Sequence, residues 1–232
     1  MTKNHLKRIP SPKSWDIMKK ENKFIIRPFA GSTSFKKGFA LGTLLRDYLK
    51  YAKSAKEAKY ILNNKEVLVN KIKRKDIHDT IGLMDIVEIP SMNKSFRILL
   101  TKKGKLELLE LNESEKNLGI FKILNKKIIK KGKIQLNLSG SKNILVKDKK
   151  YRLGDSITLD LSAKKIKDHF KLEKSSMVYL TGGKHVAESG IIDKIGNNQL
   201  IFKTKDGRSL ETSKNHAFVI GKEKSAITLF EK

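Results

Sequence analysis

The sequence contains no cysteine and few aromatic residues, and both absences narrow the chemistry open to it. Without cysteine, the chain can form neither a disulfide nor a zinc site with thiolate ligands. Aromatic residues make up 7% of the chain, and the predicted strands show no pair of aromatics that could stack splayed single-stranded bases. Recognition of unpaired bases is therefore not what this composition favours.

Long apolar runs are also missing. The longest contain four residues, far fewer than a membrane-spanning helix needs. The amino-terminal stretch MTKNHLKRIPSPKSW lacks the hydrophobic segment of a signal peptide. We therefore expect a cytoplasmic protein without a membrane partner.

Positive charge is what the chain has in excess. Lysine and arginine number 51 against 24 acidic residues, a formal net charge of +27. Such an excess destabilises a compact state by self-repulsion, so we expect a polyanionic partner, with nucleic acid ahead of an anionic membrane surface and of mere solubility. Lysines number 44 and arginines seven. Because lysine is a point charge rather than a planar fork, this ratio predicts phosphate contacts more than base reading; a coding bias of an AT-rich genome would give the same ratio.

The charge is unevenly distributed along the chain. Residues 1–40 hold 10 basic and two acidic side chains and three of the four prolines, which predicts an irregular basic arm, with disorder until binding as an open alternative. Short apolar blocks separated by turn signals predict several small modules behind it. The predicted segments are a basic arm at 1–40, a helix-containing module at 41–92, a central β domain at 93–172, a small β-barrel at 173–222 and a tail at 223–232.

Apolar spacing predicts two short helices in the second module. Between residues 41 and 53, apolar side chains recur at the period of one helix face. Ser54 stands three residues before Glu57, the spacing of a capping box that starts a second helix. Strands are predicted at EVLVN (66–70) and, after a turn, in GLMDIVEIP (82–90).

From residue 91 onward, apolar and polar residues alternate in short segments that glycines separate. The segments are SFRILLT, KLELLEL, GKIQLNL, NILV, SITLDL, MVYLT, GIIDKI, LIFKT and HAFVIG. This pattern predicts small sheets or barrels without parallel crossovers. Only SAKKIKDHF (162–170) indicates a helical turn. The fold class we predict is a multi-domain α+β protein.

No catalytic constellation emerges from the sequence. The five histidines have no metal-ligand spacing, and TGGKH lacks the glycine and hydroxyl that complete a phosphate-binding loop. Asp155 in YRLGDS invites comparison with the catalytic aspartate of RNA-modifying enzymes, but a turn aspartate is the stronger interpretation because no second catalytic group accompanies it. We expect no enzyme activity, no cofactor, no metal and no small-molecule substrate.

Two lysine-rich stretches and one tryptophan remain open to two interpretations. The stretch NKIKRKD (70–76) is either a solvated loop or, with the helix lysines, part of one anion-binding surface, which we favour. The stretch NKKIIKKGK (125–133) is either a further anion-binding segment or an exposed hairpin end, and the sequence favours neither. Trp15 either anchors the arm on a domain or wedges into RNA.

Several of these segments resemble a known family in the family's own order. LLRDYLKYAKSAKEAKYILNNKEVLVN with GLMDIVEI resembles the S-four RNA-binding domain, in which a charged helix face lies on structured RNA. KNHLKRIPSPKSW is similar to the amino-terminal signature of the archaeal and eukaryotic type of small-subunit ribosomal protein four. GKIQLNLSGSKNILV and YRLGDSITLDL resemble its central β region, and MVYLTGGKHVAESGIIDKI resembles the KOW motif.

The resemblance implies a structural constituent of the small ribosomal subunit that binds rRNA, touches neighbouring ribosomal proteins and has no catalytic role. The absence of a longer basic tail after residue 232 indicates an archaeal source. The RNA-binding residues that the resemblance implies are Lys7, Arg8, Lys13 and Trp15 in the arm, Arg46, Lys50, Lys56 and Lys59 on the helices, and Lys184 and His185, with Gly183 and Gly190, at the KOW turn. The charge pattern adds Lys53 beside the helices and Lys71, Lys73, Arg74 and Lys75 in the loop as predicted RNA-binding residues.

Two departures from the family pattern bear on geometry. Lys71 stands where the family usually has a turn glycine, and Ala187 replaces the middle glycine of the KOW motif. The geometry of the loop at Lys71 therefore stays open, and Ala187 would be strained if its position needs a positive φ. Two alternatives remain: an RNA-modifying enzyme that uses Asp155, and a transcription or translation factor that uses the KOW element.

Overall fold

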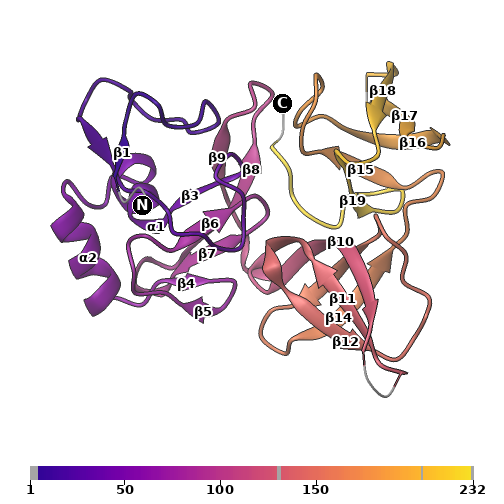
Figure 1. Ribbon diagram of the computed structural model, residues 1–232, viewed down its shortest axis with the longest axis horizontal. Coiled ribbons are helices and arrows are strands. Elements are labelled where there is room, and N and C mark those ends of the chain that lie inside the picture. The colour runs from indigo at the N-terminus through magenta and orange to yellow at the C-terminus, as the bar shows by residue number, and fades with distance from the viewer. Residues whose placement is uncertain (1–4, 130–131, 205, 231–232) are drawn as a thin grey trace. The chain divides into compact units, whose positions relative to one another are not determined.

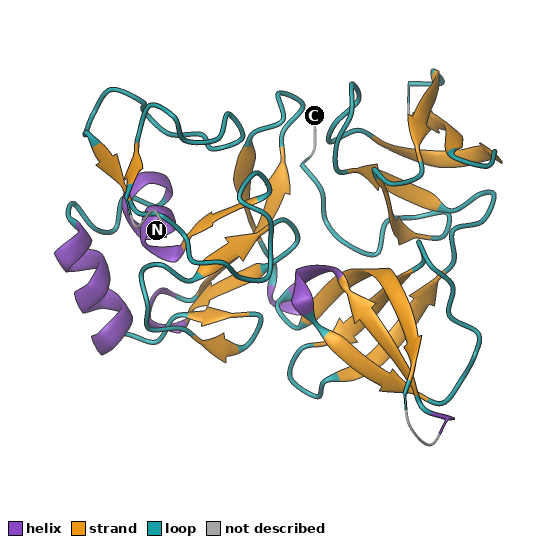
Figure 2. Ribbon diagram, in the orientation of Figure 1, coloured by secondary structure: helices purple, strands orange, loops and turns teal. Residues whose placement is uncertain are grey.

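The computed structural model describes residues 5–129, 132–204 and 206–230, and most of its regular structure is β-strand (Figures 1 and 2). The chain forms two compact units. Unit 1 comprises residues 1–99 and 105–116, and unit 2 comprises residues 100–104 and 117–232. Each is described by itself. The finer five-part division of the chain stays a prediction.

Unit 1 begins with the predicted arm, which has little regular structure but is packed against the rest of the unit. Strands β1 (Leu6–Lys7) and β2 (Phe24–Ile25) pair antiparallel, and β3 (Gly38–Ala40) pairs with β6 (Thr80–Gly82). Trp15 forms a bridge to Leu106 and is 1% exposed. Of its two interpretations, the anchor is the one the structure supports.

Two helical segments follow, and the first is shorter than predicted. It consists of α1 (Leu41–Thr43) and the π-helical turn η1 (Leu44–Tyr48), and Lys50 then adopts a left-handed φ of 55°, which ends the segment. Helix α2 (Ala55–Asn64) begins as predicted. The Ser54 hydroxyl accepts a hydrogen bond from the Glu57 amide at 3.2 Å, and the Glu57 carboxylate accepts one from the Lys53 amide at 2.7 Å.

The main sheet of unit 1 has the strand order β5-β4-β7-β8-β9. Its strands are β4 (Leu68–Val69), β5 (Ile72–Lys73), β7 (Ile86–Ile89), β8 (Lys94–Leu100) and β9 (Leu106–Glu110), with the short helices η2 (Pro90–Met92) and η3 (Glu113–Glu115) between elements. Phe39, Leu44, Leu45, Ile86 and Ile98 are fully buried. The strands predicted in 66–70, 82–90, 95–101 and 105–111 are confirmed.

Unit 2 contains two five-stranded antiparallel sheets. The first has the order β12-β11-β10-β13-β14, formed by β10 (Leu118–Ile128), β11 (Ile134–Leu138), β12 (Asn143–Val146), β13 (Ser156–Asp160) and β14 (Lys165–Phe170), with the short helix η5 (Ser139–Ser141). The helical turn predicted at 162–170 is wrong, because residues 165–170 pair with β13. Strand β10 was not predicted from the sequence, although it is the longest strand of the sheet.

The second sheet of unit 2 has the order β18-β17-β16-β15-β19. Its strands are β15 (Met177–Leu180), β16 (Ser189–Ile195), β17 (Gln199–Thr204), β18 (Ser209–Ser213) and β19 (Ala217–Gly221). Val178, Leu180, Ile192 and Phe202 belong to its core. A Cβ at Gly190 would lie 2.2 Å from the Lys203 carbonyl oxygen of the neighbouring strand β17. The close approach of the two backbones therefore requires glycine at this position.

The predicted α+β class holds in its coarse form, since the protein is mostly β with a few short helices. The barrel shape expected for 173–222 stays a prediction. Among the residues that the structure describes, no helix is both long and apolar enough to cross a membrane.

Candidate nucleic-acid interface

Helix α2 and the turn before it display lysines. Ala58 and Leu62 are fully buried, so the opposite side of the helix faces solvent. Lys50, Lys53, Lys56 and Lys59 are all exposed. Lys53 precedes the N-cap Ser54, and Lys56 and Lys59 are three residues apart within α2, so the latter two side chains are neighbours on the helix surface. Neighbouring lysines of this kind suit successive phosphates of a nucleic-acid backbone.

Arg46 differs from these lysines because a carboxylate of the same chain already holds it. Its Nε and one terminal nitrogen lie 3.2 and 3.0 Å from Oδ2 of Asp47. The other oxygen of Asp47 pairs with Arg8. The Asp47 side chain is 6% exposed and that of Arg46 14%. Arg46 is therefore partly neutralised where the sequence predicted a free cation.

Two of the contact residues predicted in the arm, Arg8 and Trp15, are buried. The Arg8 side chain is 1% exposed; besides Asp47, it pairs with Glu21 at 3.1 Å and donates to the Met18 carbonyl at 2.5 Å. These partners satisfy Nε and one terminal nitrogen, as a buried guanidinium requires, whereas the other terminal nitrogen, Nη1, is buried without a hydrogen-bond partner. As placed here, Arg8 cannot reach an external phosphate.

Trp15 is the second buried residue. Its indole Nε1–H donates to the Gly38 carbonyl at 3.0 Å, and its ring contacts those of Phe35 and Phe39 at centroid distances of 5.3 and 6.4 Å. A buried aromatic ring with its polar atom satisfied is a core residue. The other two residues predicted in the arm, Lys7 and Lys13, are exposed.

The basic loop after β4 is a two-residue hairpin turn. Val69 pairs with Ile72, and the two residues between them, Asn70 and Lys71, have φ values of 51° and 64°. Positive φ at both central residues defines a type I′ turn, in which glycine is preferred at the second position. Lys71 therefore occupies a position at which glycine, the residue usual in the family, would be less strained.

The side chains of this turn fix it to the neighbouring strands. Asn70 donates to Oδ1 of Asp85 at 2.7 Å, and Lys71 pairs with Glu88 at 2.7 Å. Lys73 and Lys75 are exposed, and Arg74 is half-buried. Of the four predicted cations in the loop, Lys73 and Lys75 are therefore the most accessible.

The KOW-like turn lies in unit 2. Lys184 is exposed, and Nδ1 of the half-buried His185 lies 3.6 Å from Oε2 of Glu188. Gly183 has a φ of 87°, and Ala187 has a φ of 63°. The sequence concern about Ala187 is therefore confirmed, since a left-handed alanine is strained. Lys184 and His185 are thus the predicted contact residues carried by unit 2.

Asp155 serves the fold of unit 2 and is not presented to a substrate. It is 2% exposed. One carboxylate oxygen accepts the Leu172 amide at 3.0 Å, and the other accepts the Arg152 amide at 3.0 Å and lies 2.7 Å from Nε2 of His169. An aspartate with both oxygens occupied in this way fastens a turn.

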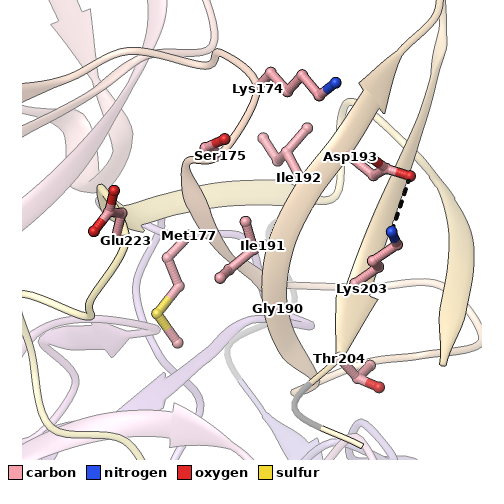
Figure 3. A pocket seen from close by; sticks show the side chains of 10 residues that line it. All are labelled: Lys174, Ser175, Met177, Gly190, Ile191, Ile192, Asp193, Lys203, Thr204 and Glu223. Carbon is pink, nitrogen blue, oxygen red and sulfur yellow. Dashed lines mark ion pairs between the residues drawn. The ribbon is translucent and has the colours of Figure 1, made fainter. Parts of the chain in front are cut away.

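A pocket of about 340 Å³ beside β16 offers no alternative site of chemistry (Figure 3). Met177, Ile191 and Ile192 line much of it, and Asp193 pairs with Lys203 at 3.6 Å. Among its described lining residues there is neither histidine nor cysteine. The nucleophile and base that a hydrolytic or transfer reaction needs are not assembled there.

Comparison with known proteins agrees with this picture. Residues 92–166 match the model of ribosomal family S4e, and residues 2–32 match that of the RS4NT domain. The chain is 40% identical to the small ribosomal subunit protein eS4 of Methanosphaera stadtmanae over 98% of its length and 96% of the relative's. It is 35% identical to the eS4 protein of Methanocaldococcus jannaschii, with 98% of both chains covered.

A solved structure is also similar. The crystal structure of the 30S ribosomal protein S4e from Thermoplasma acidophilum superposes with a TM-score of 0.69 at 29% sequence identity. The match covers 80% of this chain and 96% of the other.

Proposed function

The chain belongs to ribosomal family S4e, and from that premise we propose that it binds small-subunit rRNA through lysines displayed on both units. Its relatives named eS4 are small-subunit proteins of archaea, and this chain is likewise a structural constituent of the small ribosomal subunit and not an enzyme. The likeness over 98% of the chain is the observation that carries this conclusion. We propose that it works in the cytoplasm, where it also touches neighbouring ribosomal proteins.

The exposed cations of unit 1 form the main proposed contact. They are Lys7, Lys13, Lys50, Lys53, Lys56, Lys59, Lys73 and Lys75. Three further cations belong to this surface but contribute less. Arg46 and Lys71 are paired with Asp47 and Glu88, and Arg74 is half-buried. Arg8 and Trp15 are left out because they are buried. Lys184 and His185 form a second contact on unit 2.

We also propose that the predicted segments act as separate RNA-contacting modules. These are the arm at 1–40, the S-four-type domain at 41–92, the central β domain at 93–172, the KOW-type barrel at 173–222 and the tail at 223–232. Spreading phosphate contacts over several small modules lets one chain follow a folded RNA whose backbone changes direction. It also reduces the self-repulsion of +27 charges, since each module then meets phosphate.

A binding titration with a small-subunit rRNA transcript tests the proposal. About eight lysine–phosphate contacts predict an association constant that falls by several powers of ten between low and moderately high salt, because bound counterions are released on association. Stoichiometric presence in purified small subunits is the second expectation. Salt-insensitive binding, or absence from those subunits, would contradict the proposal; sub-stoichiometric presence would instead favour a transient translation or transcription factor.

A further inference from the structure

Strands β10, β11 and β12 present a row of three asparagines on one face of their sheet. Asn125 pairs with Asn137 across β10 and β11, and Asn137 pairs with Asn143 across β11 and β12. Residues directly opposite each other in antiparallel strands share a face. The three carboxamides therefore stand side by side across three neighbouring strands of the five-stranded sheet; Figure 1 shows the strands that carry them.

A second row lies beside the first on the same face. Lys127 pairs with Gln135, and Gln135 pairs with Leu145. Gln135 and Asn137 are two residues apart on β11, and Nε2 of Gln135 donates to Oδ1 of Asn137 at 2.9 Å, which places both side chains on one face. The alternate residues of β11, Ile134, Leu136 and Leu138, are buried. The amide rows are thus on the solvent side.

The chemistry of this face distinguishes it from the lysine surfaces. Four of its six side chains are carboxamides, which both donate and accept hydrogen bonds without carrying charge. One is a lysine, one is apolar, and none of the six is acidic. The orientation of some amides is already set: Oδ1 of Asn125 accepts the Lys126 amide at 2.7 Å, which leaves its Nδ2 as the donor toward solvent.

The charge around the face favours RNA as its occupant. Residues 91–172 carry 21 basic and eight acidic side chains, and the exposed Lys133 and Lys147 stand just before β11 and just after β12. A single apolar side chain among six is too little for a protein-binding patch, which typically has an apolar centre. Neutral amides flanked by lysines match a surface where sugar hydroxyls and base edges lie between two phosphate backbones.

We propose that this amide face binds the minor groove of an A-form rRNA helix, with the carboxamides on 2′-hydroxyls and base edges and the flanking lysines on phosphates. The RNA minor groove is wide and shallow and displays exactly those hydrogen-bonding groups, so a sheet face can approach it. The proposal rests on the proposed rRNA binding and adds to it a contact that reads RNA shape. It also gives a role to the central β domain, for which no contact residue was predicted from the sequence.

The test compares the full-length protein with the triple variant Asn125→Ala, Asn137→Ala, Asn143→Ala on a small-subunit rRNA transcript. Each lost hydrogen bond weakens binding severalfold, so the triple variant should bind about tenfold more weakly or worse. Because the amides are neutral, the dependence of binding on salt should keep its wild-type slope. Chemical probing of 2′-hydroxyls should show one protected helix in the wild-type complex and none at that place with the variant.

The matched control is Asn197→Ala, Asn198→Ala, which removes two exposed carboxamides from the turn between β16 and β17 and should bind like the wild type. A second variant, Asn137→Asp, keeps the acceptor for Gln135 but replaces the outward donor, and it should lose the same protections even if the triple variant folds poorly. Wild-type affinity and protections in both face variants would overturn the inference while leaving rRNA binding intact.

Two further outcomes are informative in different ways. Normal rRNA binding by the face variants combined with their depletion from purified subunits would mean that the face meets a protein, and the inference would be wrong. Failure of the wild-type protein itself to bind the transcript would contradict the proposed function, and with it this inference, so the two failures are distinguishable.

Discussion

Arg8 in the amino-terminal segment and Lys59 on α2 carry the same charge, yet Arg8 is buried in a pair with Asp47, whereas Lys59 is exposed. The arm carries more basic residues than α2, but both lysines of α2, Lys56 and Lys59, are exposed to solvent. Exposure and internal partners, rather than charge count, therefore decide which cations can serve a ligand.

The difference follows the chemistry of the two side chains. Among the described residues of unit 1, Arg8 and Arg97 are the buried cations, and each is held by a carboxylate of the same chain. The planar, weakly hydrated guanidinium suits a buried ion pair better than an ammonium does. Burial lowers the pKa of Arg97, and Glu115 opposes that shift. Lysines left at the surface are then available to phosphate.

The largest expected change in the free energy of unfolding comes from breaking the buried pair between Arg8 and Asp47. Asp47→Asn removes the buried one of the two carboxylates that pair with Arg8, and breaking a buried pair by removing one partner costs about 3 kcal/mol or more. Urea unfolding of the full chain measures this loss. Asp16→Asn is the matched control, since it breaks the exposed pair with Lys105 and should cost under about 1 kcal/mol. Equal losses for the two variants would mean that Arg8 does not depend on Asp47.

A smaller effect is expected in unit 2, where the side chain of Lys122 is bound inside the protein. Nζ of Lys122 donates to the carbonyls of Lys214, Asn215 and Ala217 at 3.2, 3.2 and 2.6 Å, which ties β10 to the segment before β19. Lys122→Met should cost about 2 kcal/mol in the free energy of unfolding, because charged donors make the stronger hydrogen bonds.

Lys127→Met, on the same strand but exposed, is the control for Lys122 and should change the unfolding free energy by at most about 0.5 kcal/mol. If Lys122→Met were equally silent, the three carbonyl contacts would contribute nothing to stability, and Lys122 would belong with the displayed lysines.

The smallest effect alters strain without touching any cation. Ala187→Gly should stabilise unit 2 by about 1 kcal/mol, since alanine is strained at a φ of 63°, and it should leave rRNA affinity and its salt dependence unchanged. Thermal melting checks the first expectation. Ala163→Gly, at an exposed position without a positive φ, should instead lower stability slightly. A drop in melting temperature at residue 187 would contradict the strain argument.

Local signals were the ones that the sequence revealed well. The capping box at Ser54 and Glu57 depends on residues three apart. The structure has the bond from the Glu57 amide to the Ser54 hydroxyl, while the Glu57 carboxylate accepts the amide of Lys53, one residue before the cap. The first helix was predicted too long because its apolar period continues to Ala52, whereas the chain leaves the helix at the left-handed Lys50. Periodicity reports which side is buried but not where the backbone turns.

Non-local pairing was what the sequence concealed. The lysines at 126 and 127 broke the apolar alternation that would have indicated β10, and residues 165–170 form a strand only because β13 lies beside them. In the candidate site, the exposed helix lysines could be predicted from the amphipathic pattern. The burial of Arg8 could not, because its partner Asp47 is 39 residues away in the chain.

The most direct test of displayed against internal cations is the salt dependence of rRNA binding for the variant Lys53→Ala, Lys56→Ala, Lys59→Ala. Exposed helix substitutions cost at most a few tenths of a kcal/mol each, so the fold should persist, and the slope of log affinity against log salt should become shallower by about one per lysine. Replacement of the same three lysines by arginine should retain the wild-type slope. An alanine variant that stays folded and also keeps the wild-type slope would contradict the claim that these lysines hold phosphate.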